Sequence, residues 1–300
     1  MRHVALTSRT FPGRSDVLKG VPTKSPRPLL WVGSLLATAL LVVWITDFAI
    51  HAAPLGDLTL GILLGGRTPF SGLSLPDAVW TAVSRSGILV GAALVAAVVI
   101  GVGTGAAFAF SRSRVVRGAA WAVGTVGASL PSFFWAMLLQ LVVVLVYLRT
   151  QHLLAPVSGG FGVDQHLILP AIALALRPAA YIFRTTATAL DEARHAPHVV
   201  TALAKGLGPN LIARRHVTRN AAPAVLAGIG LGAKTALSSL AIVEFVFTWN
   251  GAGYAFILSV ATGNVAFASA IALVFALALA LVGALVAVAT RALVVGSVEG

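Results

Sequence analysis

The segment Ala187–Pro223, ATALDEARHAPHVVTALAKGLGPNLIARRHVTRNAAP, is polar and basic and lies between two long apolar runs. The runs, at 166–184 and 221–248, have about the 20 residues that a helix needs to cross the hydrocarbon of a bilayer. Because both runs are able to span a membrane, the polar segment between them must emerge on one side of it. The side that it faces, and what it meets there, is therefore the main functional question.

Composition places the chain among membrane proteins. Of the 300 residues, 58% are hydrophobic and 10% are charged, and the mean hydropathy is +0.94, whereas soluble domains carry about 25% charged residues. The net charge of +12 comes from basic residues in short segments between apolar runs, which argues for membrane orientation and against nucleic-acid binding. The chain contains no cysteine, which excludes disulfides and thiolate sites.

Six apolar runs predict an all-α, polytopic membrane protein with six transmembrane helices. The runs lie at about 29–50, 86–110, 118–148, 166–184, 221–248 and 265–292. The run 29–50 exceeds the roughly 7–15 apolar residues of a cleavable signal peptide, so we expect it to be retained. Prolines inside the third and fourth runs predict bends there; they are Pro131 and Pro178.

These runs also predict how the chain is divided. We expect a basic tail at 1–28, a short extracellular segment at 51–85, a five-helix core at 86–292 and a tail at 293–300. The polar loop of the core lies at about 187–220.

Basic residues predict the orientation of these helices. Most of the arginines and lysines between spans fall in the N-terminal tail, the 111–117 turn and the polar loop: Arg2, Arg9, Arg14, Lys19, Lys24, Arg27, Arg112, Arg114, Arg117, Arg194, Lys205, Arg214, Arg215 and Arg219. The opposite loops hold Arg67, with Arg85 and Arg149 at span edges. The positive-inside rule then places the polar loop and both termini in the cytoplasm.

Two glycine-rich stretches imitate phosphate-binding loops. Residues 228–235 read GIGLGAKT, and residues 101–105 read GVGTG. A phosphate-binding loop is a turn between a strand and a helix, but both stretches fall inside predicted spans, where the amides are already bonded within the helix. We therefore expect close helix packing instead of nucleotide binding, through Gly101 with Gly105 and Gly228 with Gly232.

The histidines do not predict a metal site. Seven are present, and His195 and His198 are three residues apart, a spacing that puts both on one helix face. No pair of carboxylates at metal-ligand spacing accompanies them. We expect no metal in this chain.

Three ionisable residues fall at membrane depth, where a charge in hydrocarbon costs several kcal/mol and usually meets a cavity or a partner. They are Arg177, Lys234 and Glu244. Lys234 and Glu244 cannot pair directly, because the helix rises about 15 Å between them. All three are candidates for a translocation path, with snorkelling or an ion pair to another subunit as the alternatives. The position of Glu244 near the end of its span favours a role in anchoring the following turn.

The polar loop contains a short stretch that favours a helix. Val199–Leu207 reads VVTALAKGL, and Gly206 and the Gly208-Pro209 pair predict its end. Its residues are mostly small or apolar, which is unusual for a helix exposed to the cytosol. We expect a partner protein to cover this helix; the alternative is an amphipathic helix that lies on the membrane surface.

Several stretches match the motifs of one family. TALAKGL at 201–207 matches T-A-R-A-K-G-L, and RHVTRNA at 215–221 matches R-H-A-L-R-N-A. SLPSFFW at 129–135, HLILP at 166–170 and VEFVFTW at 243–249 agree further. From about 80 to 290, the chain resembles the inner-membrane permease subunit of ATP-binding-cassette importers of the dipeptide, oligopeptide and nickel type. The loop at 187–220 corresponds to the EAA loop of that family.

The resemblance implies the type I importer permease fold in a bacterial cytoplasmic membrane. It implies a coupling helix that docks on a separate ATPase, with contacts from Val200, Thr201, Ala202, Lys205, Gly206 and Leu207. Residues that brace the loop would be Glu192, Arg215, Arg219 and Asn220. The implied partners are a second homologous permease, two ATP-binding subunits, an extracellular substrate-binding protein and the lipid bilayer. ATP and Mg²⁺ would be bound by the ATPases, so the chain itself would be no enzyme and hold no cofactor.

The sequence departs from the family at identifiable positions. Val200 occupies the acidic position that gives the loop its name, and Pro197-His198-Val199 replaces Asp-Tyr-Val. The segment between the first two spans is shorter than usual. Di- or oligopeptides are the expected substrate, and nickel or a metal chelate is the alternative. A stand-alone secondary transporter or channel is the alternative from a different class, for which an inverted repeat would be expected.

Overall fold

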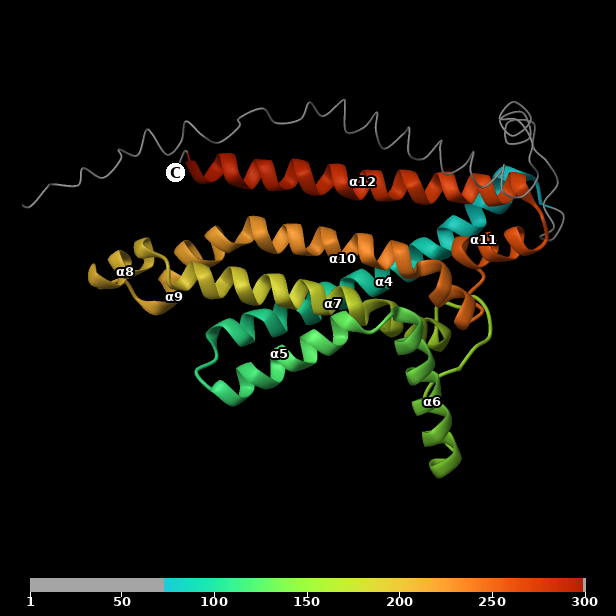
Figure 1. Cartoon of the computed structure of the whole chain (residues 1–300), viewed down its shortest axis with the longest axis horizontal. Helices are drawn as coiled ribbons and strands as arrows, with labels where there is room; N and C mark the ends of the chain where they lie inside the picture. Colours follow the sequence, from blue (N-terminus) through green and yellow to red (C-terminus); the bar gives the residue numbers. More distant parts are fainter. Residues whose placement is uncertain (1–72, 299–300) are drawn as a thin grey trace, which may run out of the picture.

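The computed structural model describes residues 73–298, and these form long helices joined by short loops (Figure 1). The predicted tail at 1–28 and the predicted first span at 29–50 lie outside the described residues. The helices are α4 (Leu75–Phe110), α5 (Arg114–Ser129), α6 (Ser132–Thr150), α7 (Gln165–Arg194), α8 (Pro197–Ala204), α9 (Pro209–Ile212), a π-helical turn (Ala213–Val217), α10 (Thr218–Val246), α11 (Ala252–Ala261) and α12 (Val265–Val298).

Within this part of the chain, five helical segments are long and apolar enough to cross a membrane. They are Leu75–Phe110, Ser132–Thr150, Gln165–Arg194, Pro209–Val246 and Val265–Leu293. The prediction of an all-helical, polytopic membrane protein is therefore confirmed. The sixth predicted span is the one at 29–50, which the structure does not describe.

The predicted start of the second span, residue 86, is wrong. Helix α4 begins at Leu75, inside the segment that was expected to be extracellular loop. Ser74 caps the helix by accepting a hydrogen bond from the amide of Asp77, and Pro76 occupies the first turn, where its missing N–H is not needed. Because the first turn is polar, the hydropathy pattern does not predict that the helix begins at Leu75.

The single bent span predicted at 118–148 is also wrong, because the chain breaks there into two helices. Helix α5 ends at Ser129, Leu130 is extended (φ −79°, ψ 137°), and α6 begins at Ser132 after Pro131. A proline disfavours helical backbone in the residue before it, so the break falls at Leu130. Helix α5 packs along α7, whereas α6 turns away from the other long helices (Figure 1).

Helix α7 is the centre of the bundle, and glycines bring α4 and α10 close to it. A Cβ atom added to Gly105 would lie 2.7 Å from Cβ of Thr186, and one added to Gly101 would lie 2.7 Å from Cβ of Ile182. The glycines of α10 face the same helix: Gly228 meets Thr185, and Gly232 meets Ile182. The close packing predicted for both glycine pairs is confirmed.

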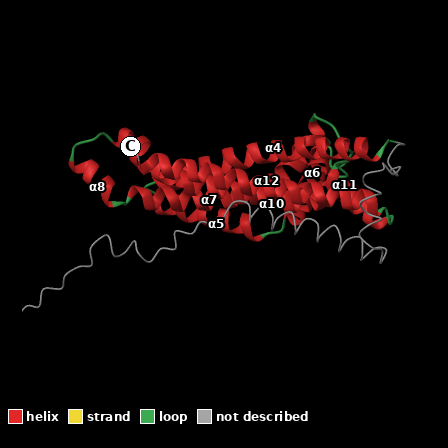
Figure 2. Ribbon diagram, turned by 90° about the horizontal axis from the view of Figure 1, so that it is seen from above, coloured by secondary structure: helices red, strands yellow, loops and turns green. Residues whose placement is uncertain are grey.

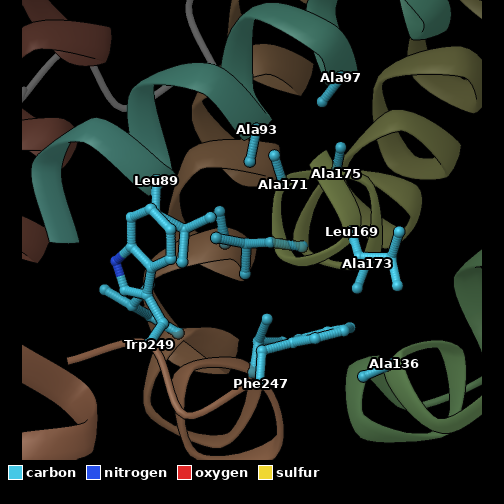
Figure 3. Close-up of a cluster of buried hydrophobic side chains, with 14 of the residues drawn as sticks. Leu89, Ala93, Ala97, Ala136, Leu169, Ala171, Ala173, Ala175, Phe247 and Trp249 are labelled. Atoms are coloured by element: carbon cyan, nitrogen blue, oxygen red, sulfur yellow. The ribbon is translucent and has the colours of Figure 1, made fainter. Parts of the chain in front are cut away.

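The largest buried cluster consists mainly of small side chains, so its helices approach closely. Figure 3 shows Ala93 and Ala97 of α4 facing Ala171 and Ala175 of α7. Trp249, which follows α10, closes the cluster and donates a hydrogen bond from Nε1 to the carbonyl oxygen of Arg85 (3.2 Å). The outward faces of α4 and α12 are apolar; they include Val95, Val99, Leu277, Leu281, Leu285 and Val288.

The two ends of the bundle differ. One end, here called the α8 end, gathers α8 and α9 with the C-termini of α7 and α12 and the N-terminus of α10 (Figures 1 and 2). The opposite end carries α11 and the start of α12. The polar loop is thus a folded unit on one end of the bundle.

Candidate functional site

The loop between α7 and α10 is built around α8, whose end is set by a glycine. The amide of Gly206 donates to the carbonyl of Leu203 (2.9 Å), and the amide of Leu207 donates to that of Ala202 (3.3 Å). This pair of bonds is the Schellman motif, which needs a left-handed residue after the cap. Gly206 supplies it with φ +77°. The predicted helix end at Gly206 is confirmed.

Helix α8 has one buried and one exposed side. Val199 and Ala202 pack with Ala109, Leu190 and Ile212 of the neighbouring helices. The exposed residues of α8 and its cap include Val200, Thr201, Leu203, Lys205 and Gly206, and Leu207 is partly buried.

This burial places one predicted contact residue on the inner side. Ala202 is 4% exposed, so its methyl group packs against the neighbouring helices. Leu203, which the motif comparison did not select, is 56% exposed and stands beside Val200 on the outer side. Sequence could have indicated this side, because Val199 and Ala202 are three residues apart and share a helix face.

Among the four loop residues predicted as braces, Asn220 contacts α8. Asn220 Nδ2 lies 3.0 Å from His198 Nε2 and so links the start of α10 to α8. Glu192, Arg215 and Arg219 are all exposed. Within residues 73–298, no hydrogen bond or ion pair joins the side chain of Glu192 or Arg215 to another part of the chain.

An ion-pair cluster at the α8 end was not predicted. Asp191 of α7 accepts two hydrogen bonds from Arg117 of α5, at 3.1 and 3.2 Å. Arg194 donates to the carbonyl oxygen of Ala109, the last turn of α4, and lies 3.9 Å from Asp191. The guanidinium of Arg117 also stacks over the ring of Phe108 at 4.4 Å. The cluster therefore joins α4, α5 and the end of α7 directly beneath the loop.

Glu244 is wholly buried. Its carboxylate accepts hydrogen bonds from the hydroxyl of Ser86 (2.5 Å) and from the amide of Tyr254 (3.0 Å). The same hydroxyl accepts a bond from the amide of Ala252 (2.7 Å). The carboxylate thereby holds the turn between α10 and α11 against α4, which is the anchoring role favoured for it by its position. Its place on a translocation path stays a prediction.

Arg177 and Lys234 lie on different helices and have different neighbours. Arg177 lies near the middle of α7 with its guanidinium 5.9 Å from the ring centre of Tyr181, and its buried Nε has no hydrogen-bond partner in the structure. Lys234 is exposed on α10, and its Nζ lies 3.6 Å from where a Cβ of Gly283 in α12 would stand. Neither forms an ion pair with any carboxylate of the described chain.

The described residues hold no group of three or more histidine, cysteine, aspartate or glutamate side chains that could bind a metal ion. His195 and His198, three residues apart in sequence, are each occupied. His195 Nδ1 lies 2.7 Å from the carbonyl oxygen of Asp191, and His198 contacts Asn220.

A bundle of spanning helices with a folded polar loop at one end, and with cations at membrane depth, defines a polytopic membrane protein of the transport class. The chain belongs to the family of binding-protein-dependent transport system inner membrane components, whose model matches residues 97–295. The match begins in the middle of α4 and includes the whole loop and most of α12.

Curated relatives carry names from peptide transport. The chain is 32% identical over 184 residues to a di/tripeptide transport system permease protein of Pseudomonas aeruginosa, covering 54% of this chain and 55% of the relative. It is 32% identical over 170 residues to a dipeptide transport system permease protein of Bacillus subtilis, covering 56% and 53%. A putative peptide permease protein of Brucella suis is 33% identical over 180 residues, covering 58% and 56%. The chain thus spans about half the length of the curated relatives it matches.

Proposed function

We propose that this chain is a transmembrane permease subunit of an ATP-driven importer of di- or oligopeptides. It would form half of the translocation pathway with a second, homologous permease. The observation that carries the proposal is the folded loop. It exposes one side of α8 at the end of the helix bundle, in a chain that belongs to this transport family. The names of the relatives support peptide as the substrate.

The exposed side of α8 suits a docking role. Val200 and Leu203 are 60% and 56% exposed, and burying such side chains against a partner is favourable by roughly 25 cal/mol per Å². Lys205 at the end of the helix adds a cation. An ATPase subunit that covers this side would push on α7 and α10 through the packed residues Val199 and Ala202.

The remaining partners follow from this role. Two ATP-binding subunits would bind ATP and Mg²⁺ and carry out hydrolysis, so this chain needs no cofactor of its own. An external binding protein would deliver substrate at the end that carries α11. In this arrangement the α8 end and both termini face the cytoplasm, in agreement with the arginines and lysines gathered there.

The charges at membrane depth favour peptide over free nickel ions. Arg177 and Lys234 are cations with no carboxylate neighbour among residues 73–298, and they would repel a divalent cation. An anionic metal chelate would be tolerated, and it remains the alternative substrate. A stand-alone secondary transporter would need neither ATPase subunits nor an exposed α8.

Reconstitution tests the proposal. The chain is assembled with its second permease and its ATPases in liposomes, the binding protein is added outside, and uptake of a labelled dipeptide is measured with and without ATP inside. Uptake that requires both ATP and the ATPases is expected. Uptake by this chain alone, driven by an ion gradient, would establish the secondary-transporter alternative instead.

A further inference from the structure

A partly buried face in the middle of α7 is polar and cationic, unlike the outward faces of α4 and α12. Arg177, Tyr181 and Arg184 are spaced four and three residues apart, so they lie on one face of the helix. All three are partly buried, whereas the residues between them are mostly buried in the bundle. We call these three residues the α7 stripe.

Neighbouring contacts show which side of α7 the stripe occupies. Helix α4 packs against Ile182 and Thr186, and α10 packs against Thr185 and Ile182. The stripe falls outside these contacts. The outward faces of α4 and α12 present leucine and valine, as Leu281 and Leu285 of α12 do. A face that carries two arginines is therefore unsuited to hydrocarbon.

The two arginines are held in place by aromatic rings and have donors to spare. The guanidinium of Arg177 lies 5.9 Å from the ring centre of Tyr181, and that of Arg184 lies 5.4 Å from the ring centre of Trp121 on α5. Arg177 Nε is buried and has no hydrogen-bond partner. A buried, unpaired donor on a charged group is costly, and a ligand that accepts hydrogen bonds removes the cost.

We propose that the α7 stripe is an anion-binding site in a water-accessible path through the membrane, and that it takes the carboxylate of the transported peptide. The peptide part of the inference rests on the proposed function; the anion site does not. A planar guanidinium matches a carboxylate with two parallel hydrogen bonds, which a lysine cannot provide. Lys234, which lies beside Gly283 of α12, is not part of the site.

Cysteine labelling tests the anion site, because the chain has no cysteine of its own. Tyr181→Cys in the full-length chain in its membrane keeps both arginines in the sequence, one on each side of the thiol, and removes only the ring beside Arg177. It is treated with water-soluble anionic and cationic methanethiosulfonates, and rates are normalised to a free thiol. The anionic reagent is expected to react several-fold faster, with the preference reduced by Arg177→Gln. Leu281→Cys on the apolar face of α12 is the control and should stay unlabelled.

Substrate protection tests the ligand. In the assembled transporter, a dipeptide with a free carboxylate should slow the labelling of Tyr181→Cys, and Arg177→Gln should abolish the protection by lowering affinity about 10-fold or more. An unlabelled Tyr181→Cys, or equal rates for the two reagents, would overturn the anion site. Equal protection with and without Arg177 would overturn the carboxylate assignment. If the wild-type transporter imports no dipeptide, the proposed function fails, and the reagent preference alone still decides whether the site binds anions.

Discussion

Replacing Gly105 by alanine should separate α4 from α7, whereas the same change at Gly103 should not. Both glycines lie on α4 in the GVGTG stretch, two residues apart. A Cβ added at Gly105 would lie 2.7 Å from Cβ of Thr186 and 2.9 Å from the carbonyl oxygen of Phe183. At Gly103 nothing lies within 4 Å of the added atom.

The magnitude follows from comparing the two variants. Each gains about 0.8–1 kcal/mol because alanine favours a helix more than glycine does, so this contribution cancels in the difference. Carbon atoms pack best at about 3.5–4.0 Å, so at Gly105 the helices must move apart. Overpacking of this kind costs about 1–3 kcal/mol. Gly105→Ala should thus be about 1–3 kcal/mol less stable than Gly103→Ala.

Thermal unfolding of the two purified variants in the same mild detergent measures this difference, with wild type as the reference. Gly101→Ala should behave like Gly105→Ala, because its added Cβ would lie 2.7 Å from Cβ of Ile182. Equal unfolding temperatures for Gly103→Ala and Gly105→Ala would refute the packing of α4 on α7. Nucleotide binding that depends on the GVGTG stretch would also contradict this interpretation.

Two further predictions concern the loop and its base. Asp191→Asn removes the ion pair with Arg117 and should lower the free energy of unfolding by no more than about 1 kcal/mol, because the pair is partly exposed. The double exchange Arg117→Asp with Asp191→Arg should recover part of this loss, and no recovery would show that the pairing itself contributes nothing. Gly206→Ala meets no steric clash but places a Cβ on left-handed backbone, at a cost of about 1 kcal/mol, and Gly206→Val should cost more. Limited proteolysis should therefore cleave the loop slowest in wild type, faster in Gly206→Ala and fastest in Gly206→Val, and equal rates would exclude the strain.

The pattern of apolar runs was enough to predict an all-helical membrane protein and most of its spans, because hydrocarbon imposes a minimum helix length. The same pattern predicts one span where the structure has the two helices α5 and α6, since an apolar run does not show where the helical hydrogen bonds stop. Pro131 predicts a bend, but the extended conformation that it imposes on Leu130 ends the helix there. The backbone restriction before proline, and not the hydropathy of the run, therefore sets the end of α5.

The candidate site was predicted in part. The run Val199–Leu207 and the glycines at its end predict α8 and its end, but they do not show that Ala202 faces inward, because burial depends on how α8 packs against α4 and α7. The pair Arg117 and Asp191 was missed because its members are 74 residues apart in sequence. The position of Glu244 favours an anchor for the following turn, but it does not name Ser86 of α4 as one of its partners. A local sequence pattern does not predict contacts between segments that are far apart in the chain.

If this chain is the proposed permease, an ATPase subunit covers the outer side of α8. A photoreactive group attached to Leu203→Cys tests this contact, with Leu281→Cys on α12 as a matched control, since the two native side chains are 56% and 59% exposed. After illumination of the assembled transporter in its membrane, position 203 should cross-link to the ATPase, while position 281 should not. Cross-linking of position 203 to lipid, with no ATPase adduct, would show that α8 lies on the membrane surface and not on an ATPase.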